Sequence, residues 1–287
     1  MIAMARETLP MKKTVLQTLK YSFLVLLSVI VVFPFYILIK ESFHPNLVTL
    51  PYPVQLLPRF FSSANYMILF QRYPVIKWIL NSFVISAGTS AAQLLLCSMA
   101  AFGFSRTEFR GRKILLSLLM VMLVIPIQTR ILPLFIFMSG VGWVNTYLAW
   151  IPFFVDAFGI FLMMQFMEAI PREYDAAAFI DGAGLLTTFT KIIAPQTKPA
   201  MVVLVTFNFI NQWNDFLYPL IMVRNDRMYT LQLGLANIFS QAQRGEGGGI
   251  GVALAGAVIS FLPTLIIFLV YQKQIISGMS ISAGVKG

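Results

Sequence analysis

The chain has 287 residues, of which 58% are hydrophobic and 11% charged, and its mean hydropathy is +0.80. Soluble globular domains carry about 25% charged residues, so this composition excludes a soluble fold and predicts an integral membrane protein. In a soluble protein the net charge of +10 would suggest binding to nucleic acid. In a membrane protein it is explained by basic residues in the segments between the spans, so we expect no nucleic-acid partner.

Six apolar segments are long enough to cross the roughly 30 Å hydrocarbon core as tilted helices. They cover residues 21–39, 78–102, 114–136, 145–167, 200–222 and 250–270. The sequence therefore predicts an all-α, polytopic membrane protein with six transmembrane helices. Its predicted parts are an N-terminal segment at 1–20, a transmembrane domain at 21–277 and a C-terminal tail at 278–287.

The lysines and arginines are distributed unequally between the two sides of these spans. Thirteen lie in segments on the side of the amino terminus and seven in segments on the other side. Cytoplasmic segments of membrane proteins carry the excess of basic residues. We therefore expect both termini, and the long loop at 168–199, to lie in the cytoplasm.

The second and fifth predicted spans carry polar side chains at helical spacing. These are Ser82, Ser86, Thr89 and Gln93 in the second span, and Asn208, Asn211, Gln212 and Asp215 in the fifth. Residues spaced i, i+3, i+4 and i+7 share one face of a helix, and polar groups that face lipid are costly. Each stripe is expected to line a substrate path or to hydrogen-bond helix to helix. Gln93 and the four residues of the fifth span are our candidates for the path.

One cation, Arg130 in "VIPIQTRILP", lies inside the third predicted span. On a straight helix from Ile114, at 1.5 Å per residue, it would lie about 24 Å along the axis, at a depth similar to Asp215. Four roles fit this position: an ion pair with Asp215, an ion pair with Asp156, contact with an anionic substrate, or extension of the side chain to the outer surface. We include Arg130 among the candidates for the path.

The segment "EYDAAAFIDGAG", residues 173–184, is acidic and rich in alanine. Pro171 is suited to open a helix, and Glu173 and Asp175 then stabilise its first turns through the helix dipole. Gly182 and Gly184 are suited to end that helix. A second short helix is expected from Leu185 to Ile193, stopping before Pro195.

This segment resembles the cytoplasmic coupling loop of ABC importer permeases, whose pattern is Glu-Ala-Ala, three residues, Gly, nine residues and Ile-x-Leu-Pro. Ala177 and Ala178 match the two alanines, Gly182 matches the glycine, and Ile192 and Pro195 match the end. Ala176 and Ala194 replace the Glu and the Leu of the pattern. "WNDFLYPL" at 213–220 and the ending "SGMSISAGVKG" resemble the carbohydrate-uptake branch, close to the second permease of the maltose and glycerol-phosphate importers.

The resemblance implies a permease subunit in the bacterial cytoplasmic membrane. It would pair with a second, homologous permease, rest on two ATPase subunits and receive a carbohydrate from an extracytoplasmic solute-binding protein. ATP and Mg would be bound by the ATPase; this chain is expected to hold no cofactor or metal and not to be an enzyme. The residues implied in ATPase docking are Glu173, Asp175, Ala176, Ala177, Ala178, Asp181, Gly182, Ala183, Ile192 and Pro195. Asp175 is expected to supply part of the charge missing at position 176.

The substrate and the energy source have alternatives. A cation on the path favours an acidic oligosaccharide, whereas neutral sugars need only hydrogen-bonding and stacking groups. A glycerol-phosphate-type importer is a second possibility. An ion-coupled secondary transporter would use intramembrane carboxylates such as Asp156 and Asp215. A membrane-embedded enzyme is disfavoured because no catalytic set of residues is evident in the sequence.

Overall fold

In the computed structural model, residues 8–45, 55–58 and 61–283 are described, and all regular structure within them is helical. The predicted all-α class is confirmed for this part of the chain. The elements are α1 (Thr8–Ser42), α2 (Ala64–Arg72), α3 (Val75–Arg106), α4 (Arg112–Val124), α5 (Ile127–Gly140), η1 (Tyr147–Phe153), α6 (Ala157–Glu168), α7 (Glu173–Ile180), α8 (Leu185–Thr188), η2 (Phe189–Ile193), α9 (Ala194–Gln196), α10 (Lys198–Asn214), α11 (Leu217–Met222), η3 (Asp226–Met228), α12 (Leu231–Gln243) and α13 (Ile250–Ala283).

The two predicted terminal segments lie partly outside the described residues. Of the segment 1–20, residues 8–20 belong to α1, and of the tail 278–287, residues 278–283 continue α13. Residues 1–7 and 284–287 are not described.

The chain divides into two compact units. The first comprises residues 1–73 and 238–259. Within it, the side-chain amide of Asn65 on α2 donates to the carbonyl oxygens of Ser42 and His44, both at 2.8 Å. The Tyr73 hydroxyl donates to Gln241 Oε1 of α12 at 2.8 Å. These polar contacts connect the end of α1, α2 and α12.

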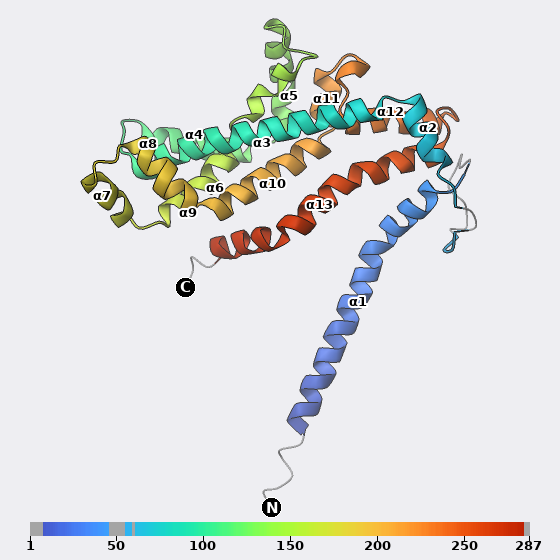
Figure 1. Cartoon of the computed structure of the whole chain (residues 1–287), viewed down its shortest axis with the longest axis horizontal. Coiled ribbons are helices and arrows are strands. Elements are labelled where there is room, and N and C mark those ends of the chain that lie inside the picture. Colours follow the sequence, from blue (N-terminus) through green and yellow to red (C-terminus); the bar gives the residue numbers. More distant parts are fainter. Residues whose placement is uncertain (1–7, 46–54, 59–60, 284–287) are drawn as a thin grey trace, which may run out of the picture. The chain divides into compact units, whose positions relative to one another are not determined.

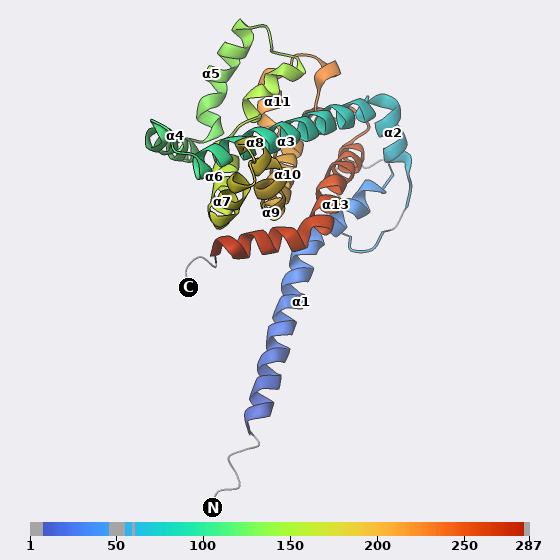
Figure 2. The same cartoon turned by 60° about the vertical axis from the view of Figure 1, so that its left-hand side comes forward.

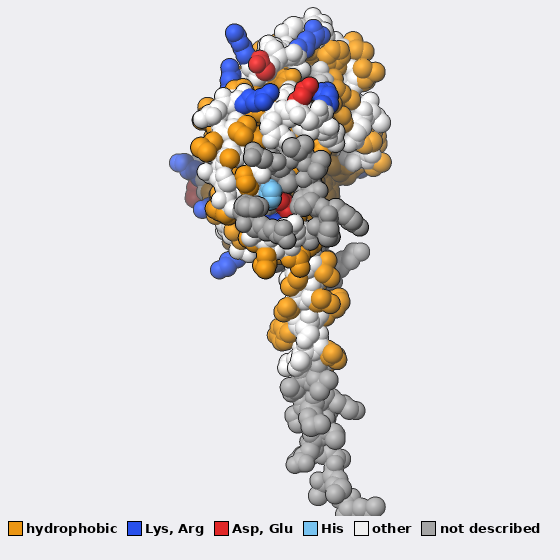
Figure 3. Space-filling view, turned by 90° about the vertical axis from the view of Figure 1, so that its right-hand side faces the viewer, with side chains coloured by type: hydrophobic (Ala, Val, Ile, Leu, Met, Phe, Trp, Pro, Cys, Tyr) orange, Lys and Arg blue, Asp and Glu red, His pale blue; other side chains and the backbone are white. Residues whose placement is uncertain are grey.

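Helix α1 carries the first predicted span. Its segment Leu16–Ser42 is long and apolar enough to cross a membrane. Large apolar side chains on all sides of this segment are exposed, and Figure 3 shows them as hydrophobic groups on α1 in the lower part of the view. A helix that exposes apolar side chains on all sides is suited to lipid or to a partner helix.

The second unit comprises residues 74–237 and 260–287, and its core is formed by α3, α6 and α10. These three helices contact one another, and Figure 1 shows α3 and α10 side by side. Their shared core includes Cys97, Met163 and Leu204, and Ile193 of η2 packs in the same cluster. Gly159 permits the close approach, because a Cβ there would lie 3.0 Å from both Cys97 Sγ and Leu204 Cδ1.

Three of the six predicted spans are uninterrupted helices. The described residues contain three helices long and apolar enough to cross a membrane, Leu16–Ser42, Val75–Arg106 and Ile250–Gln274. These correspond to the first, second and sixth predictions. Two further spans would be added if each of two bent helix pairs crosses as one.

The third predicted span, 114–136, was expected to be one straight helix, and this expectation is wrong. Helices α4 and α5 meet at an angle of 106°. The break falls at Pro126, which has no N–H to donate, and the preceding Ile125 is extended (φ −78°, ψ 113°) as a residue before proline prefers. The straight-helix depth of Arg130 is therefore also wrong.

The fourth and fifth predicted spans are interrupted as well. In 145–167, η1 and α6 are bent by 46°, and Asp156 caps α6 by accepting from the Gly159 N–H at 2.7 Å. In 200–222, α10 ends at Asn214, and Asp215 is extended before α11 begins. The spacing predicted that Asp215 shares a helical face with Asn208. This prediction is wrong, because Asp215 lies beyond the end of α10. Both aspartates favour helix starts because their carboxylates accept from free N–H groups.

The loop at 168–199 contains the two short helical stretches that the sequence predicts. Helix α7 covers Glu173–Ile180, and Gly182 follows it with a left-handed φ of 77°. The second stretch does not stop before Pro195 but runs through α8, η2 and α9 to Gln196. Its middle part, η2, is a π-helix in which the Ala194 N–H bonds to Phe189 O. This wider turn accommodates Pro195, which has no N–H for the helical ladder.

Candidate functional site

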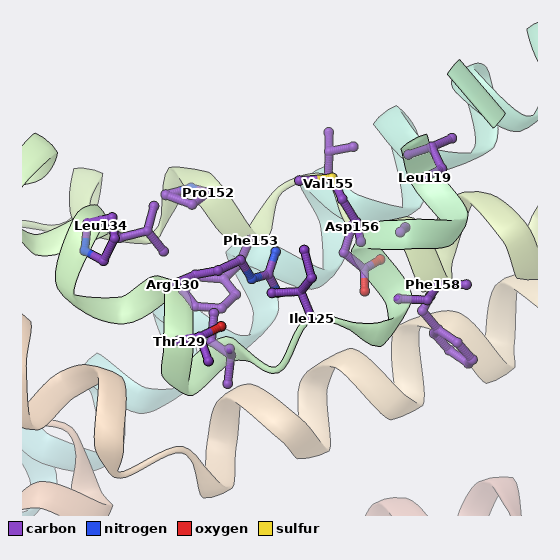
Figure 4. Close-up of a pocket in the computed structure, with 15 residues that line it drawn as sticks. Leu119, Ile125, Thr129, Arg130, Leu134, Pro152, Phe153, Val155, Asp156 and Phe158 are labelled. Carbon is purple, nitrogen blue, oxygen red and sulfur yellow. The ribbon is translucent and has the colours of Figure 1, made fainter. Parts of the chain in front are cut away.

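A cavity of about 670 Å³ lies between the α4–α5 bend and the η1–α6 break. Figure 2 shows α4, α5 and α6, and Figure 4 shows the residues that line the cavity. Its lining is mainly apolar, with two charged side chains, Arg130 and Asp156. The sequence predicted neither the α4–α5 bend nor the η1–α6 break. Both contribute residues to this one cavity, Ile125 from the bend and Asp156 from the break.

Arg130 lies in the first turns of α5 and has no ionic partner among the described residues. No carboxylate of the described chain lies within 4.0 Å of it, and its buried Nε has no hydrogen-bond partner. In Figure 4 the Arg130 guanidinium and the Asp156 carboxylate lie in the same cavity, with Ile125 between them. Of the two aspartates considered as partners, the structure thus places Asp156 near Arg130. Asp215 does not line this cavity, and its Oδ1 accepts from the Tyr218 N–H at 3.3 Å.

Asp156 is held in place by three groups. Its Oδ1 accepts from the Gly159 N–H at 2.7 Å and from Gln93 Nε2 at 2.8 Å. The Cys97 thiol donates to the Asp156 carbonyl oxygen at 3.7 Å. Gln93, a candidate for the path, is buried on α3 and orients Asp156; it does not line the cavity.

The polar stripe of the fifth predicted span meets the stripe of the second. Asn208 Nδ2 donates to Ser90 Oγ at 3.2 Å and to Thr89 Oγ1 at 3.4 Å. Gln212 is buried, whereas Asn211 is exposed. These contacts show that Asn208 hydrogen-bonds helix to helix. The structure does not bring Asn211, Gln212 or Asp215 to the cavity of Arg130.

A second group of functional candidates lies on α7, the turn after it, η2 and α9. Glu173, Ala176, Ala177, Asp181, Gly182 and Pro195 are exposed, Ala183 and Ile192 are half-buried, and Ala178 is buried. Large apolar side chains share this surface: Ile180 is 85% exposed and Leu186 68%. The loop therefore presents both small residues and apolar groups to the outside.

The Asp175 side chain faces α3 and not the outer surface of α7. Its Oδ2 lies 3.1 Å from Arg106 Nη1 at the end of α3, and its side chain is 13% exposed. The expectation that this charge compensates for the missing Glu at position 176 meets a competing partner, because Arg106 already neutralises it. Sequence reasoning missed Arg106, since it was counted only as one of the basic residues that set topology; its place at the end of a span was the available signal.

Among the described residues, no group of three or more His, Cys, Asp or Glu side chains is arranged to hold a metal ion.

Comparison with known proteins identifies the family. Residues 93–275 match the family described as the binding-protein-dependent transport system inner membrane component. The arabinooligosaccharides transport system permease protein AraQ of Bacillus subtilis is 33% identical, covering 92% of this chain and 94% of that protein. The galactooligosaccharides transport system permease protein GanQ of the same organism is 30% identical, covering 93% and 94%.

Solved structures share the fold. A chain of a bacterial ABC transporter involved in the import of the acidic polysaccharide alginate superposes with a TM-score of 0.78 at 20% identity, covering 91% of this chain and 97% of that chain. The same kind of transporter in complex with an alginate pentasaccharide-bound periplasmic protein gives a TM-score of 0.65 at 15% identity, covering 90% and 92%. The matches to the family and to its relatives extend over most of the chain. The protein belongs to the family of inner membrane components of binding-protein-dependent transport systems and is the permease subunit of an ABC importer, a transport component and not an enzyme.

Proposed function

We propose that this permease imports an oligosaccharide. The observation that carries the proposal is the similarity, over more than nine-tenths of the chain, to permeases named for arabino- and galacto-oligosaccharides. The experiment is growth and uptake on a panel of oligosaccharides and on glycerol phosphate, in a strain that lacks this chain, with and without its gene restored. Restoration of uptake for at least one oligosaccharide supports the proposal. Restoration for glycerol phosphate alone would favour the glycerol-phosphate-type importer instead.

The substrate path is proposed to include the cavity of Arg130 and Asp156. The cavity combines mostly apolar walls with a cation that has no ion pair within the described chain, and such a cation is suited to a carboxylated or otherwise anionic sugar. An acidic oligosaccharide is therefore the second candidate substrate. Gln93 and Asn208 are proposed to support the path, Gln93 by orienting Asp156 and Asn208 by connecting α10 to α3. For Asn211, Gln212 and Asp215 a role in the path stays a prediction from the sequence.

Docking on the ATPase is proposed for the exposed residues of α7, of the turn that follows it and of α8. The exposed small residues allow close approach of a partner, and Ile180 and Leu186 offer apolar area for burial. In this proposal ATP and Mg are bound in two separate ATPase subunits, a second homologous permease completes the pathway, and a solute-binding protein delivers the sugar outside. Co-purification of ATPase subunits with the tagged chain is the direct measurement, and their absence from a functional complex would contradict it.

The proposed topology has six passes with both termini in the cytoplasm. The bent pairs α4–α5 and η1–α6 would then each form one pass, and α10 with α11 another. The support is the distribution of basic residues together with the length of the helices. Labelling of single cysteines at Lys113 and Lys191 from the cytoplasmic side, and at Arg227 from the outside, tests it; the reverse pattern would overturn it.

A further inference from the structure

One buried guanidinium connects the end of α3 to α6 and α7. Arg106 Nη2 donates to the carbonyl oxygens of Met167 at 2.7 Å and Ile170 at 2.8 Å, which lie at and just beyond the end of α6. Nη1 of the same group lies 3.1 Å from Asp175 Oδ2 on α7. The Arg106 side chain is 4% exposed. A planar guanidinium with several donors suits such a junction, because it fixes the direction of each partner.

Two neighbouring contacts strengthen the attachment of the loop to α3. Arg172 Nη2 donates to the Ser105 carbonyl oxygen at 3.0 Å. The Phe189 ring of η2 packs on Phe102 of α3, with ring centroids 5.2 Å apart. The stretch before α7 and the stretch after α8 are thus both attached to the last turns of α3.

Helix α3 also contacts a residue of the cavity wall. Gln93 precedes Arg106 by thirteen residues, which corresponds to about 20 Å along an α-helix. Its amide donates to Asp156, the aspartate that lines the cavity with Arg130. One uninterrupted helix therefore contacts α7 at its C-terminal end and, thirteen residues earlier, contacts the aspartate that lines the cavity.

We propose that the Arg106–Asp175 ion pair is the joint through which movement of α7 reaches α3 and α6. Arg106 is then a positioning residue for transport, and Asp175 serves this joint and not the surface of the ATPase. The inference rests on the proposed function, in which α7 docks on the ATPase. Coupling between remote sites requires a physical element that both sites bias. The two charges are largely removed from water, with the side chains of Arg106 and Asp175 4% and 13% exposed, and Arg106 is also hydrogen-bonded to the carbonyl oxygens of α6 and the residues after it. Such an ion pair can transmit displacement, because separating its charges inside the protein is costly.

The test uses the complete complex of both permeases, ATPase subunits and binding protein in proteoliposomes. The variants are Asp175→Asn, Arg106→Gln and the double variant. We expect the ATPase subunits to remain bound and basal ATP hydrolysis to persist. Stimulation of hydrolysis by the loaded binding protein, and uptake per ATP, should fall about five- to tenfold, within the usual range of allosteric coupling. The double variant should be no worse than Arg106→Gln alone, because both changes remove the same contact.

Arg112→Gln is the matched control, because Arg112 is the first residue of α4 and also contacts the end of α3. Arg112 Nε donates to Phe104 O at 2.7 Å, and its Nη2 lies 3.6 Å from Glu168 Oε1, so Arg112 touches α6 without an ion pair to α7. This partly exposed arginine should change stimulation by less than about twofold, as surface substitutions usually do.

Four results would overturn the joint: unchanged stimulation in Asp175→Asn at normal yield, additive losses in the double variant, an equal loss in Arg112→Gln, or release of the ATPase subunits by Asp175→Asn. The last result would show that Asp175 belongs to the docking surface.

If Arg106→Gln does not accumulate, Asp175→Asn decides alone, since it keeps the shape of the side chain and the bonds from Arg106 to the carbonyl groups. A wild-type complex that holds no ATPase would contradict the proposed function and not the joint.

Discussion

Arg106 and Arg130 are both arginines of the second compact unit, yet their surroundings differ. The terminal nitrogens of Arg106 contact two carbonyl oxygens and the Asp175 carboxylate. Arg130 has no hydrogen bond or ion pair among the described residues, although it lines a cavity with Asp156. In both, the buried Nε lacks a hydrogen-bond partner, so the difference lies in the terminal nitrogens.

This difference separates a charge that stabilises a junction from a charge that is available to a ligand. A charge removed from water is costly unless it is paired. For Arg106 the chain supplies the pairing, so its substitution should affect how the helices are held. For Arg130 the chain supplies a cavity, so its substitution should affect what is bound there.

The largest effect is expected for Gly159→Ala, which would disturb the support of the Arg130 cavity. The new Cβ would lie 2.7 Å from Asp156 Oδ1 and 3.0 Å from Leu204 Cδ1. Overpacking of this kind costs about 1–3 kcal/mol. The melting temperature of the purified permease measures this loss of stability and should be lower in the variant. Gly103→Ala on α3, where nothing lies within 4 Å of the added Cβ, is the control and should not destabilise the protein.

Gly182→Val should disturb the region of Arg106 by changing the turn after α7. Gly182 has a left-handed φ of 77°, which costs an ordinary residue about 1–2 kcal/mol and a β-branched one more. We expect intact membrane insertion with loss of most ATPase subunits during purification. Gly184→Ala is the matched control, because Gly184 is extended (φ −79°, ψ 169°) and has open space around it. Full retention of the ATPase and normal transport in Gly182→Val would count against docking through this turn.

Arg130→Gln separates the substrate role of the cation from a structural one. If the guanidinium meets an anionic sugar, uptake of an acidic oligosaccharide should fall about fivefold relative to a neutral analogue, corresponding to about 1 kcal/mol for a partly exposed ion pair. Competition between the two sugars in one uptake assay gives this ratio directly. An unchanged ratio at normal yield would remove the argument for an acidic substrate.

Asp156→Asn should have the smallest effect. Asparagine caps a helix about as well as aspartate, so the melting temperature should stay nearly unchanged. Loss of a negative charge beside Arg130 should raise the relative uptake of the acidic sugar. A marked fall in yield, restored in the double variant Arg130→Gln with Asp156→Asn, would instead show that the two charges stabilise each other.

The sequence predicted the features that depend on local patterns. The long apolar helices α1, α3 and α13, the helix α7 and the turn at Gly182 were all predicted correctly. A long apolar run, a proline and acidic residues suited to a first turn, and a glycine suited to end a helix are local properties, and they can be recognised without knowledge of the fold.

The breaks and the charge pairs were not predicted. Pro126, Asp156 and Asp215 lie inside apolar segments whose length alone indicated single helices, but each favours the start or end of a helix. The partners of Arg106 and Asp175 lie on different helices, so their spacing along the chain carries no signal. The same holds for Gln93 and Asp156, which are 63 residues apart.

The most direct test of the account is uptake of a radiolabelled oligosaccharide into proteoliposomes that contain the complete complex. We predict uptake that requires ATP at the ATPase side and the sugar-loaded binding protein on the other side, and that is independent of proton and sodium gradients. Uptake driven by an ion gradient without ATP, and abolished by neutralising Asp156 or Asp215, would contradict the account and support an ion-coupled transporter.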